Sequence, residues 1–207
     1  MSFSKHFLAD TIAVIGQIDE TSLEAAAEVL AATRARDGRL FFCGSGGGAG
    51  HASHAACDFR KLAGFEAYCI TDNVSELTAR VNDDGWDTSY ANWLRSSKLR
   101  AGDCLFVFSV GGGSIEPPVS VNLVNAIRLA KEVGASVVGV VGRDGGALRQ
   151  LADACVLLPT VDPKLVTPQT EGLQALAWHL LVSHPFLAAS IAKWEGLDAT
   201  AVGAPSH

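Results

Sequence analysis

Histidine and aspartate side chains recur at helical spacing in the segment from residue 51 to residue 58. His54 and Asp58 are four residues apart, so on a helix they stand one above the other and could bind one metal ion or form an acid–base pair. His51 precedes His54 by three residues and could join them. An ordinary hydrogen-bonded side chain is the simpler interpretation of any single histidine. The position of all three near the start of a helix, just after a glycine-rich turn, favours a site.

A second polar set, Glu171, Gln174 and His179, lies in an otherwise apolar helical segment. Polar groups on a buried helix need partners, so this set forms either a core network or a site. Glu171 and His179 are separated by a rise of about 12 Å and a rotation of about 80° on a straight helix. One ion could contact both only if the side chains lean together or come from different subunits. His184, before Pro185, is expected to interact with the helix C-terminus rather than with a metal.

Two glycine-rich turns follow apolar runs. They are Gly44-Ser45-Gly46-Gly47-Gly48 and Gly111-Gly112-Gly113-Ser114. Glycine adopts positive φ and leaves backbone amides unobstructed, and a following helix adds partial positive charge, so each turn could hold a phosphate or sugar oxygens. The first turn also resembles part of a dinucleotide fingerprint, but its third glycine is misplaced and no acidic residue ends the second strand. A purely structural turn is the alternative for either. Finding two at equivalent places favours ligand binding.

The elements that position these residues alternate along the chain. Apolar periodicity predicts helices at 3–18 and 21–36, the second with Thr21 as N-cap and Glu24 completing a capping box. Continuously apolar runs, typical of strands buried on both faces, are found at 39–43, 67–70, 104–109, 136–141 and 154–158. Further helices are predicted at 49–63, 74–81, 87–96, 118–133, 145–152 and 167–183. This order predicts a three-layer α/β/α fold around a doubly wound parallel five-stranded sheet, with ligands at the carboxyl ends of the strands.

Length and composition restrict the classes of function. The 207 residues, 48% of them hydrophobic, are enough for one core. We expect a single domain with a helical arm at 1–37, an α/β core at 38–198 and a flexible tail at 199–207. The net charge of −6 offers no basic surface for nucleic acid. Five cysteines without a CxxC pair are expected to be reduced thiols in a cytoplasmic protein. Without a signal-like N-terminus or a long apolar run, we expect no membrane association.

The segment from Gly44 to Asp58 resembles the SIS (sugar isomerase) domain of phosphoheptose isomerases, whose pattern runs GNGGSAxDAxHFxxEL. The resemblance continues through Asn82-Asp83 to the helix that carries Glu171 and His179. It implies a homotetramer packed through the two N-terminal helices, with active sites at subunit interfaces, and conversion of sedoheptulose 7-phosphate to a heptose 7-phosphate. It also implies that zinc ligands and a proton-transfer pair lie among four residues, which are His54, Asp58, Glu171 and His179. Asp83 matches a residue that contacts substrate.

The departures from the family pattern concern charge and hydroxyl groups. The family phosphate loop STSGNS is replaced by SVGGGS at 109–114, which loses two hydroxyls, and Gly48 stands where the first turn has serine. Asp58 replaces glutamate and draws its carboxylate back by about 1.5 Å. Glu171 replaces glutamine and adds a negative charge. A set of two histidines, an aspartate and a glutamate is a better divalent-cation site than the family's own.

Together these features predict an aldose–ketose isomerase acting on a phosphorylated sugar, with a seven-carbon sugar as first choice. We expect His179 as the first-choice acid–base residue, Asp58 as the second, and zinc held by His54, Asp58, Glu171 and His179. The expected substrate-binding residues are Ser45, Gly46, Gly47, Gly48, Asp83, Ser109, Gly111, Gly112, Gly113 and Ser114. The alternatives are a sugar-phosphate sensor, and a tetrameric scaffold that docks a partner protein, as replication-initiator-associating relatives do. Retention of the four polar residues favours the enzyme.

Overall fold

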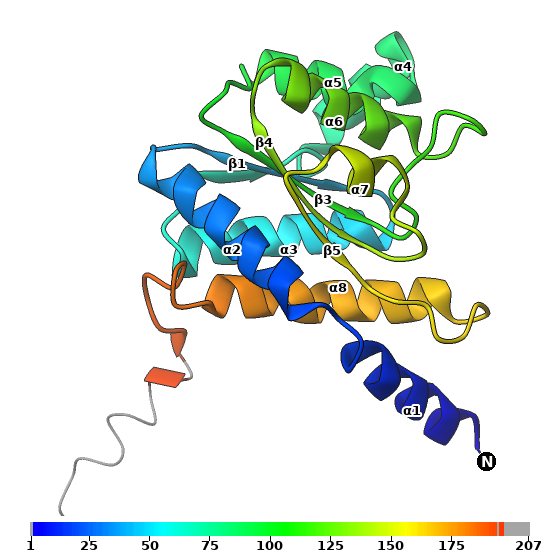
Figure 1. Ribbon diagram of the computed structural model, residues 1–207. Helices are drawn as coiled ribbons and strands as arrows, with labels where there is room; N and C mark the ends of the chain where they lie inside the picture. Colours follow the sequence, from blue (N-terminus) through cyan, green and yellow to red (C-terminus); the bar gives the residue numbers. More distant parts are fainter. Residues whose placement is uncertain (1, 194, 197–207) are drawn as a thin grey trace, which may run out of the picture.

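The computed structural model describes residues 2–193 and 195–196, so the predicted tail at 199–207 lies outside the described residues (Figure 1). All five predicted strands form. They are β1 (Leu40–Gly44), β2 (Ala67–Cys69), β3 (Cys104–Ser109), β4 (Ser136–Val141) and β5 (Ala154–Leu157). They pair in parallel in the order β2-β1-β3-β4-β5. The chain therefore reverses its direction of winding between β1 and β3, and both glycine-rich turns lie at the carboxyl ends of these two strands, where ligands bind in such sheets.

Helices cover both faces of the sheet, as the alternation of elements predicts. One face carries α2 (Glu20–Ala35), α3 (Gly47–Leu62) and α8 (Val166–Ser183). The other carries α4 (Val74–Asp84), α5 (Trp86–Ser96), α6 (Val121–Glu132) and α7 (Gly146–Leu151). Figure 1 shows these two helical layers above and below the sheet. The helices of the described residues include none with the length and apolar character to cross a bilayer.

The two N-terminal helices behave differently. α2 packs onto the sheet and buries Leu23, Ala26 and Leu30. Helix α1 (Phe3–Ile15) projects from the body of the molecule (Figure 1), and Val14 is its one buried residue. The buried face of α2 is thus used within its own chain, whereas α1 leaves nearly all of its side chains accessible.

The cap of α2 also differs from the prediction. Asp19, not Thr21, is the N-cap, and its Oδ1 atom accepts from the backbone N–H of Thr21 (3.0 Å) and from the Thr21 hydroxyl (2.8 Å). Both residue types cap helices well. Asp19 is the N-cap because its backbone is extended, with φ −74° and ψ 109°. The helix therefore begins at Glu20, one residue earlier than the predicted start at residue 21.

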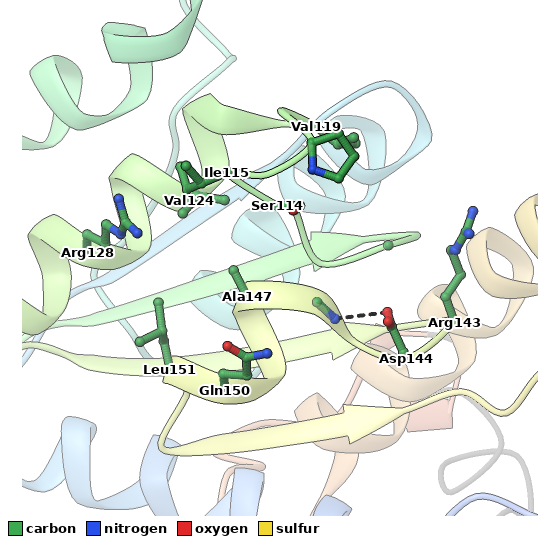
Figure 2. Close-up of a pocket in the computed structure, with 14 residues that line it drawn as sticks. Ser114, Ile115, Val119, Val124, Arg128, Arg143, Asp144, Ala147, Gln150 and Leu151 are labelled. Carbon is green, nitrogen blue, oxygen red and sulfur yellow. Dashed lines mark hydrogen bonds between the residues drawn. The ribbon is translucent and has the colours of Figure 1, made fainter.

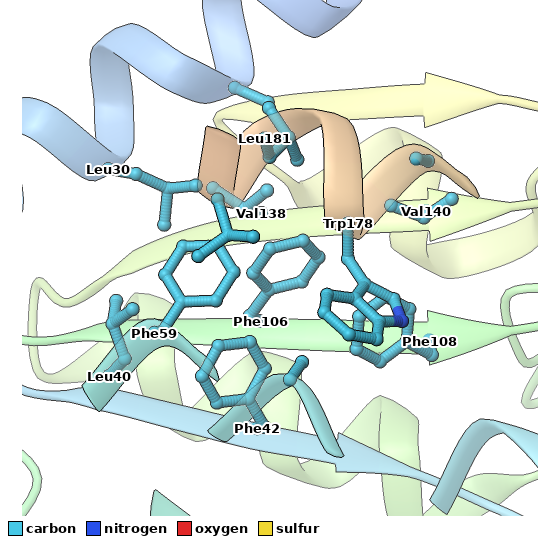
Figure 3. Packing of buried hydrophobic residues seen from close by; sticks show 14 of the residues in the cluster. Leu30, Leu40, Phe42, Phe59, Phe106, Phe108, Val138, Val140, Trp178 and Leu181 are labelled. Carbon is cyan, nitrogen blue, oxygen red and sulfur yellow. The ribbon is translucent and has the colours of Figure 1, made fainter. Parts of the chain in front are cut away.

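The main core lies between the sheet and the layer formed by α2, α3 and α8. It is rich in aromatic rings, with centroids of Phe42 and Phe106 5.2 Å apart and those of Phe106 and Phe108 4.8 Å apart. Phe59 on α3 and Trp178 on α8 close over these rings (Figure 3). The sheet has a second core on its other face, which explains why the central parts of its strands are apolar on both faces.

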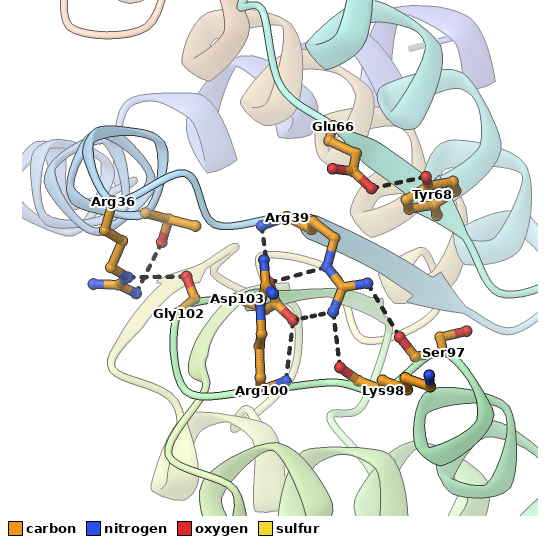
Figure 4. A network of polar contacts seen from close by, with 10 residues as sticks. Arg36, Arg39, Glu66, Tyr68, Ser97, Lys98, Arg100, Gly102 and Asp103 are labelled. Atoms are coloured by element: carbon orange, nitrogen blue, oxygen red, sulfur yellow. Dashed lines mark hydrogen bonds and ion pairs between the residues drawn. The ribbon is translucent and has the colours of Figure 1, made fainter.

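A buried ion pair fixes the opposite, amino-terminal edge of the sheet. Asp103, fully buried before β3, accepts from Arg39 through Nη2 (2.7 Å) and Nε (3.2 Å) and from the Arg39 backbone N–H (3.0 Å). Arg39 also donates to the backbone carbonyls of Ser97 and Lys98 (Figure 4). The hydrogen bond to Asp103 raises the pKa of the Arg39 guanidinium above its usual value. Both charges are satisfied, so this pair joins the starts of β1 and β3.

Candidate active site

The first glycine-rich turn brings α3 against the sheet. Gly46 is the N-cap of α3 and adopts φ 58° and ψ −122°, a conformation that favours glycine. A Cβ atom on Gly44 would lie 2.3 Å from the carbonyl carbon of Gly48, and one on Gly48 would lie 2.7 Å from the Phe108 oxygen. Gly48, at the family's serine position, therefore has no room for a side chain. These glycines allow the start of α3 to lie directly on β1 and β3.

His54, Asp58 and His179 converge where α3 packs on α8. The His54 Nε2 and Asp58 Oδ2 atoms are 3.7 Å apart, and the rings of His54 and His179 have centroids 5.6 Å apart. One ligand atom from each of the three residues lies within 4.8 Å of the others. His54 is 60% exposed and Asp58 18%, so the cluster opens to solvent on one side. Three of the four predicted metal ligands thus meet in one chain.

The tautomer of His179 is set by its own helix. Its Nδ1 atom lies 2.7 Å from the carbonyl oxygen of Ala175, and because a carbonyl only accepts, Nδ1 must carry the hydrogen. The Nε2 atom is then left with a free lone pair, which can bind a metal ion or accept a proton. Trp178, fully buried, stacks on His179 and packs edge-on against His54 with ring centroids 4.8 Å apart. It forms the floor of the cluster, a role that its place beside His179 in the sequence could have suggested.

Glu171 lies apart from this cluster, two turns towards the start of α8. A Cβ atom on Gly47 would meet the Glu171 carboxyl carbon at 2.5 Å, so this carboxylate lies against the first residue of α3. There it interacts favourably with the positive end of the helix dipole. His51 is next to it. Burial lowers the pKa of His51, and the backbone carbonyl and charge of Glu171 offset this in part.

The second glycine-rich turn is held by its own hydrogen bonds and by α7. The Ser109 hydroxyl accepts from Gly112 N–H (2.9 Å), and the Ser114 hydroxyl donates to Glu116 O (3.1 Å). Gly112 and Gly113, both with positive φ, offer their carbonyls to backbone N–H groups at the start of α7. Among the described residues, the Ser109 hydroxyl donates no hydrogen bond, so its hydrogen is available for a ligand. Ser109 is, however, only 9% exposed.

The hollow beside this turn is a cavity of about 620 Å³ between the β3–α6 and β4–α7 connections. Gly111, Gly113 and Ser114 line it together with two arginines. Figure 2 shows Arg128 and Arg143 at opposite ends of the cavity. Neither arginine belongs to a recognisable sequence motif, so neither was predicted as a site residue.

Asp83 is not brought to the cluster within one chain. It lies exposed near the end of α4, where its Oδ1 atom accepts from Asn82 (2.7 Å). α4 lies on the sheet face opposite to α3 and α8. The structure of one chain therefore does not place Asp83 beside the His54 cluster. The first turn is also incomplete by itself, since the buried Ser45 Oγ atom has no hydrogen-bond partner among the described residues.

Comparison with known proteins gives the same picture. A family model described as the SIS domain matches residues 6–142. The chain is 36% identical over 195 residues to the lincomycin biosynthesis protein LmbN of Streptomyces lincolnensis, covering 89% of this chain and 69% of that protein. It is 34% identical over 178 residues to the phosphoheptose isomerase of Rhodospirillum rubrum, covering 84% and 88%. The solved structure of phosphoheptose isomerase from Neisseria gonorrhoeae matches with a TM-score of 0.73 at 30% identity, covering 86% and 93%.

The fold and the matched residues define an SIS domain protein. Within that class, the chain belongs to the phosphoheptose isomerase family, whose members are phosphosugar isomerases. The resemblance first noted in the glycine-rich turn and the following helix is confirmed.

Proposed function

We propose that this protein interconverts the ketose and aldose forms of a phosphorylated sugar, and that sedoheptulose 7-phosphate is the first substrate to test. The observation that carries the proposal is the convergence of His54, Asp58 and His179 beside the first glycine-rich turn, in a chain whose relatives include phosphoheptose isomerases. We further propose a cytoplasmic homotetramer formed from single-domain subunits.

The reaction requires a proton to move between two neighbouring carbons, so a base must reach the carbon next to the carbonyl and return the proton. His179 is suited to this because its Nδ1–H is held by Ala175 and its Nε2 lone pair is free. Asp58 is the second candidate, since its carboxylate is partly exposed within the same cluster. The backbone amides of the glycine-rich turns, with Ser45, Ser109 and Ser114, are the proposed phosphate-binding groups.

The donor set fits zinc. Two imidazole nitrogens and a carboxylate oxygen within 4.8 Å of one another are ligands that zinc accepts at about 2.0–2.2 Å. His54, Asp58 and His179 would hold the ion, whereas Glu171, the fourth predicted ligand, lies against Gly47. When bound, zinc would polarise the substrate carbonyl. His179 cannot use Nε2 for the metal and for a proton at once, which makes the two roles separable by experiment.

The test compares His54→Ala with His179→Ala, with His184→Ala as a control. His184 pairs with Glu24 (3.2 Å) away from the cluster. Aldose formation from sedoheptulose 7-phosphate is measured with and without added zinc, together with zinc content. Loss of a general acid–base residue costs about 10²–10⁴ in rate, so His179→Ala should stay inactive at any zinc concentration if it transfers the proton. His54→Ala should bind zinc weakly and recover activity at excess zinc.

The same assay decides between enzyme and binding protein. If no C5 to C7 ketose phosphate is converted by the zinc-loaded wild type, the proposal fails. Binding of a sugar phosphate without turnover would then favour a sensor, and absence of binding at millimolar ligand would favour a scaffold.

A further inference from the structure

A second cluster of metal-ligating side chains joins the projecting helix α1 to the connection before α8. His6 and Asp10 stand four residues apart on α1, with His6 Nε2 and Asp10 Oδ2 3.2 Å apart. Asp162, from the β5–α8 connection, places its Oδ2 atom 3.7 Å from the same His6 nitrogen. We propose that His6, Asp10 and Asp162 bind a divalent transition-metal ion, with zinc as the first choice, and that the ion holds α1 against the body of the subunit.

The spacing of the three groups is close to that of a formed site. Two ligands at about 2.0–2.1 Å from a tetrahedral zinc ion are about 3.3 Å apart. The His6 Nε2 atom lies 3.2 Å from Asp10 Oδ2 and 3.7 Å from Asp162 Oδ2, and one atom from each of the three residues lies within 4.8 Å of the others. Small side-chain rotations would therefore complete the site. One imidazole nitrogen and two carboxylate oxygens suit zinc or manganese and leave a fourth position for water.

Among the described residues, the two carboxylates of the cluster share a single ion-pair partner, the imidazole of His6. The Asp10 Oδ2 atom is buried and, among the described residues, accepts no hydrogen bond. Neither Asp10 nor Asp162 forms an ion pair with a lysine or arginine in the described part of the chain. Two neighbouring carboxylates that share one imidazole, one of them with a buried oxygen that accepts no hydrogen bond, would gain from a cation between them. A divalent ion satisfies both.

The backbone already orients one ligand. The Oδ1 atom of Asp162 accepts from the backbone N–H of Lys164 at 2.8 Å, which leaves Oδ2 directed at His6. An outer hydrogen bond of this kind fixes a ligating carboxylate before the metal arrives. The Asp162 carbonyl also accepts from Leu165 N–H, just before α8 begins at Val166. The proposed ion would thus link α1 to the base of the helix that carries His179.

The experiment uses the tag-free full chain carrying His54→Ala and His179→Ala, so that zinc at the α3–α8 cluster does not contribute. After dialysis against zinc and then zinc-free buffer, metal content is measured by mass spectrometry. We expect about one zinc ion per subunit, lost on adding either His6→Ala or Asp162→Asn, with at least tenfold weaker zinc binding. His184→Ala is the matched control, because His184 and Glu24 form the same kind of pair at 3.2 Å with no third ligand in the described residues. It should leave the zinc content unchanged.

A second readout follows folding. Zinc should raise the melting temperature of the His54→Ala, His179→Ala protein, because a ligand that binds only the folded state stabilises it. The shift should disappear with Asp162→Asn. Should the double variant fail to fold, the same comparison is made in the wild type, where His6→Ala should remove one zinc equivalent. Full zinc retention or an undiminished melting shift in Asp162→Asn would overturn the proposal, whatever the isomerase assay shows.

Discussion

The Glu171 carboxylate occupies the place at the start of α3 where an anionic ligand would bind. It lies against Gly47, beside the turn whose amides are the proposed phosphate site. A helix N-terminus stabilises one nearby negative charge, and a phosphate arriving there must share that field with Glu171 or displace it. The family's glutamine carries no such charge. We therefore expect the charge of Glu171 to weaken the binding of a phosphate at the proposed site.

We predict that Glu171→Gln tightens the binding of a sugar phosphate about tenfold in metal-free buffer, equivalent to about 1.4 kcal/mol. The substitution keeps the size of the side chain and removes its charge. Calorimetric titration with sedoheptulose 7-phosphate in EDTA measures the change, which should shrink at high salt. Glu24→Gln, an exposed carboxylate on α2, is the control. Equal affinities of wild type and Glu171→Gln would show that the phosphate binds elsewhere.

At the scale of elements, the candidate site depends on how α3 and α8 lie together over the aromatic core. Phe106 on β3 contacts Phe42, Phe59 and Phe108, and Trp178 on α8 joins the same cluster and supports both site histidines. A smaller side chain in the core beneath α3 and α8 should therefore shift Trp178 and, with it, the two histidines that pack on Trp178.

We predict that Phe106→Leu lowers the free energy of unfolding by about 1–2 kcal/mol. The cause is lost ring contacts in a fully buried position. Urea denaturation measures the change. Phe186→Leu is the matched control, because Phe186 is 51% exposed, and its effect should stay within about 0.5 kcal/mol. An equal effect of the two substitutions would contradict the role given to the core.

At the scale of the whole molecule, exposed apolar side chains point to assembly. Phe3, Leu8 and Ile12 on α1 are 70%, 61% and 70% exposed. Leu176 and Leu180 flank His179 on α8 and are each 39% exposed. Surfaces of this kind on neighbouring elements are typical of subunit interfaces. If Asp83 contacts substrate as predicted, assembly would be one way to bring it to a His54 cluster, because α4 lies on the other face of the sheet.

We predict that the wild type is a tetramer and that Leu8→Glu with Ile12→Glu dissociates it, because buried charge at an apolar interface is costly. Light scattering after size exclusion gives the masses, and Lys5→Glu, an exposed charged position on the same helix, should leave the tetramer intact. A monomeric wild type would contradict the predicted tetramer. A double variant that stays tetrameric would show that α1 does not form the interface.

Much of the fold could be predicted because strands buried on both faces are continuously apolar. Each strand begins and ends within about one residue of its predicted bounds. Helix ends were less predictable. α6 begins at Val121, three residues later than predicted, because Pro117, Pro118 and the left-handed Ser120 belong to the preceding connection. α4 continues to Asp84, since polar residues at an exposed helix end carry no periodic signal.

The site was predictable where it follows from spacing along one helix. His54 and Asp58 meet because i and i+4 side chains share a face. The sequence predicted that both Glu171 and His179 would join them. That His179 does so while Glu171 lies at Gly47 depends on how α8 packs on α3, which residue spacing does not reveal. The placement of Asp83 depends on the order of strands in the sheet, which separates α4 from α3 by a whole layer.

The buried pair of Arg39 and Asp103 lies at the edge of the sheet remote from the glycine-rich turns. It ties together the starts of two central strands and the end of α5 without using any residue of the candidate site. The contacts that join the strands at this edge and the residues of the candidate site are therefore separate sets. The turns can exchange side chains, as SVGGGS differs from STSGNS, while the amino-terminal edge keeps the sheet assembled. A side-chain change in either glycine-rich turn therefore leaves the Arg39–Asp103 contacts in place.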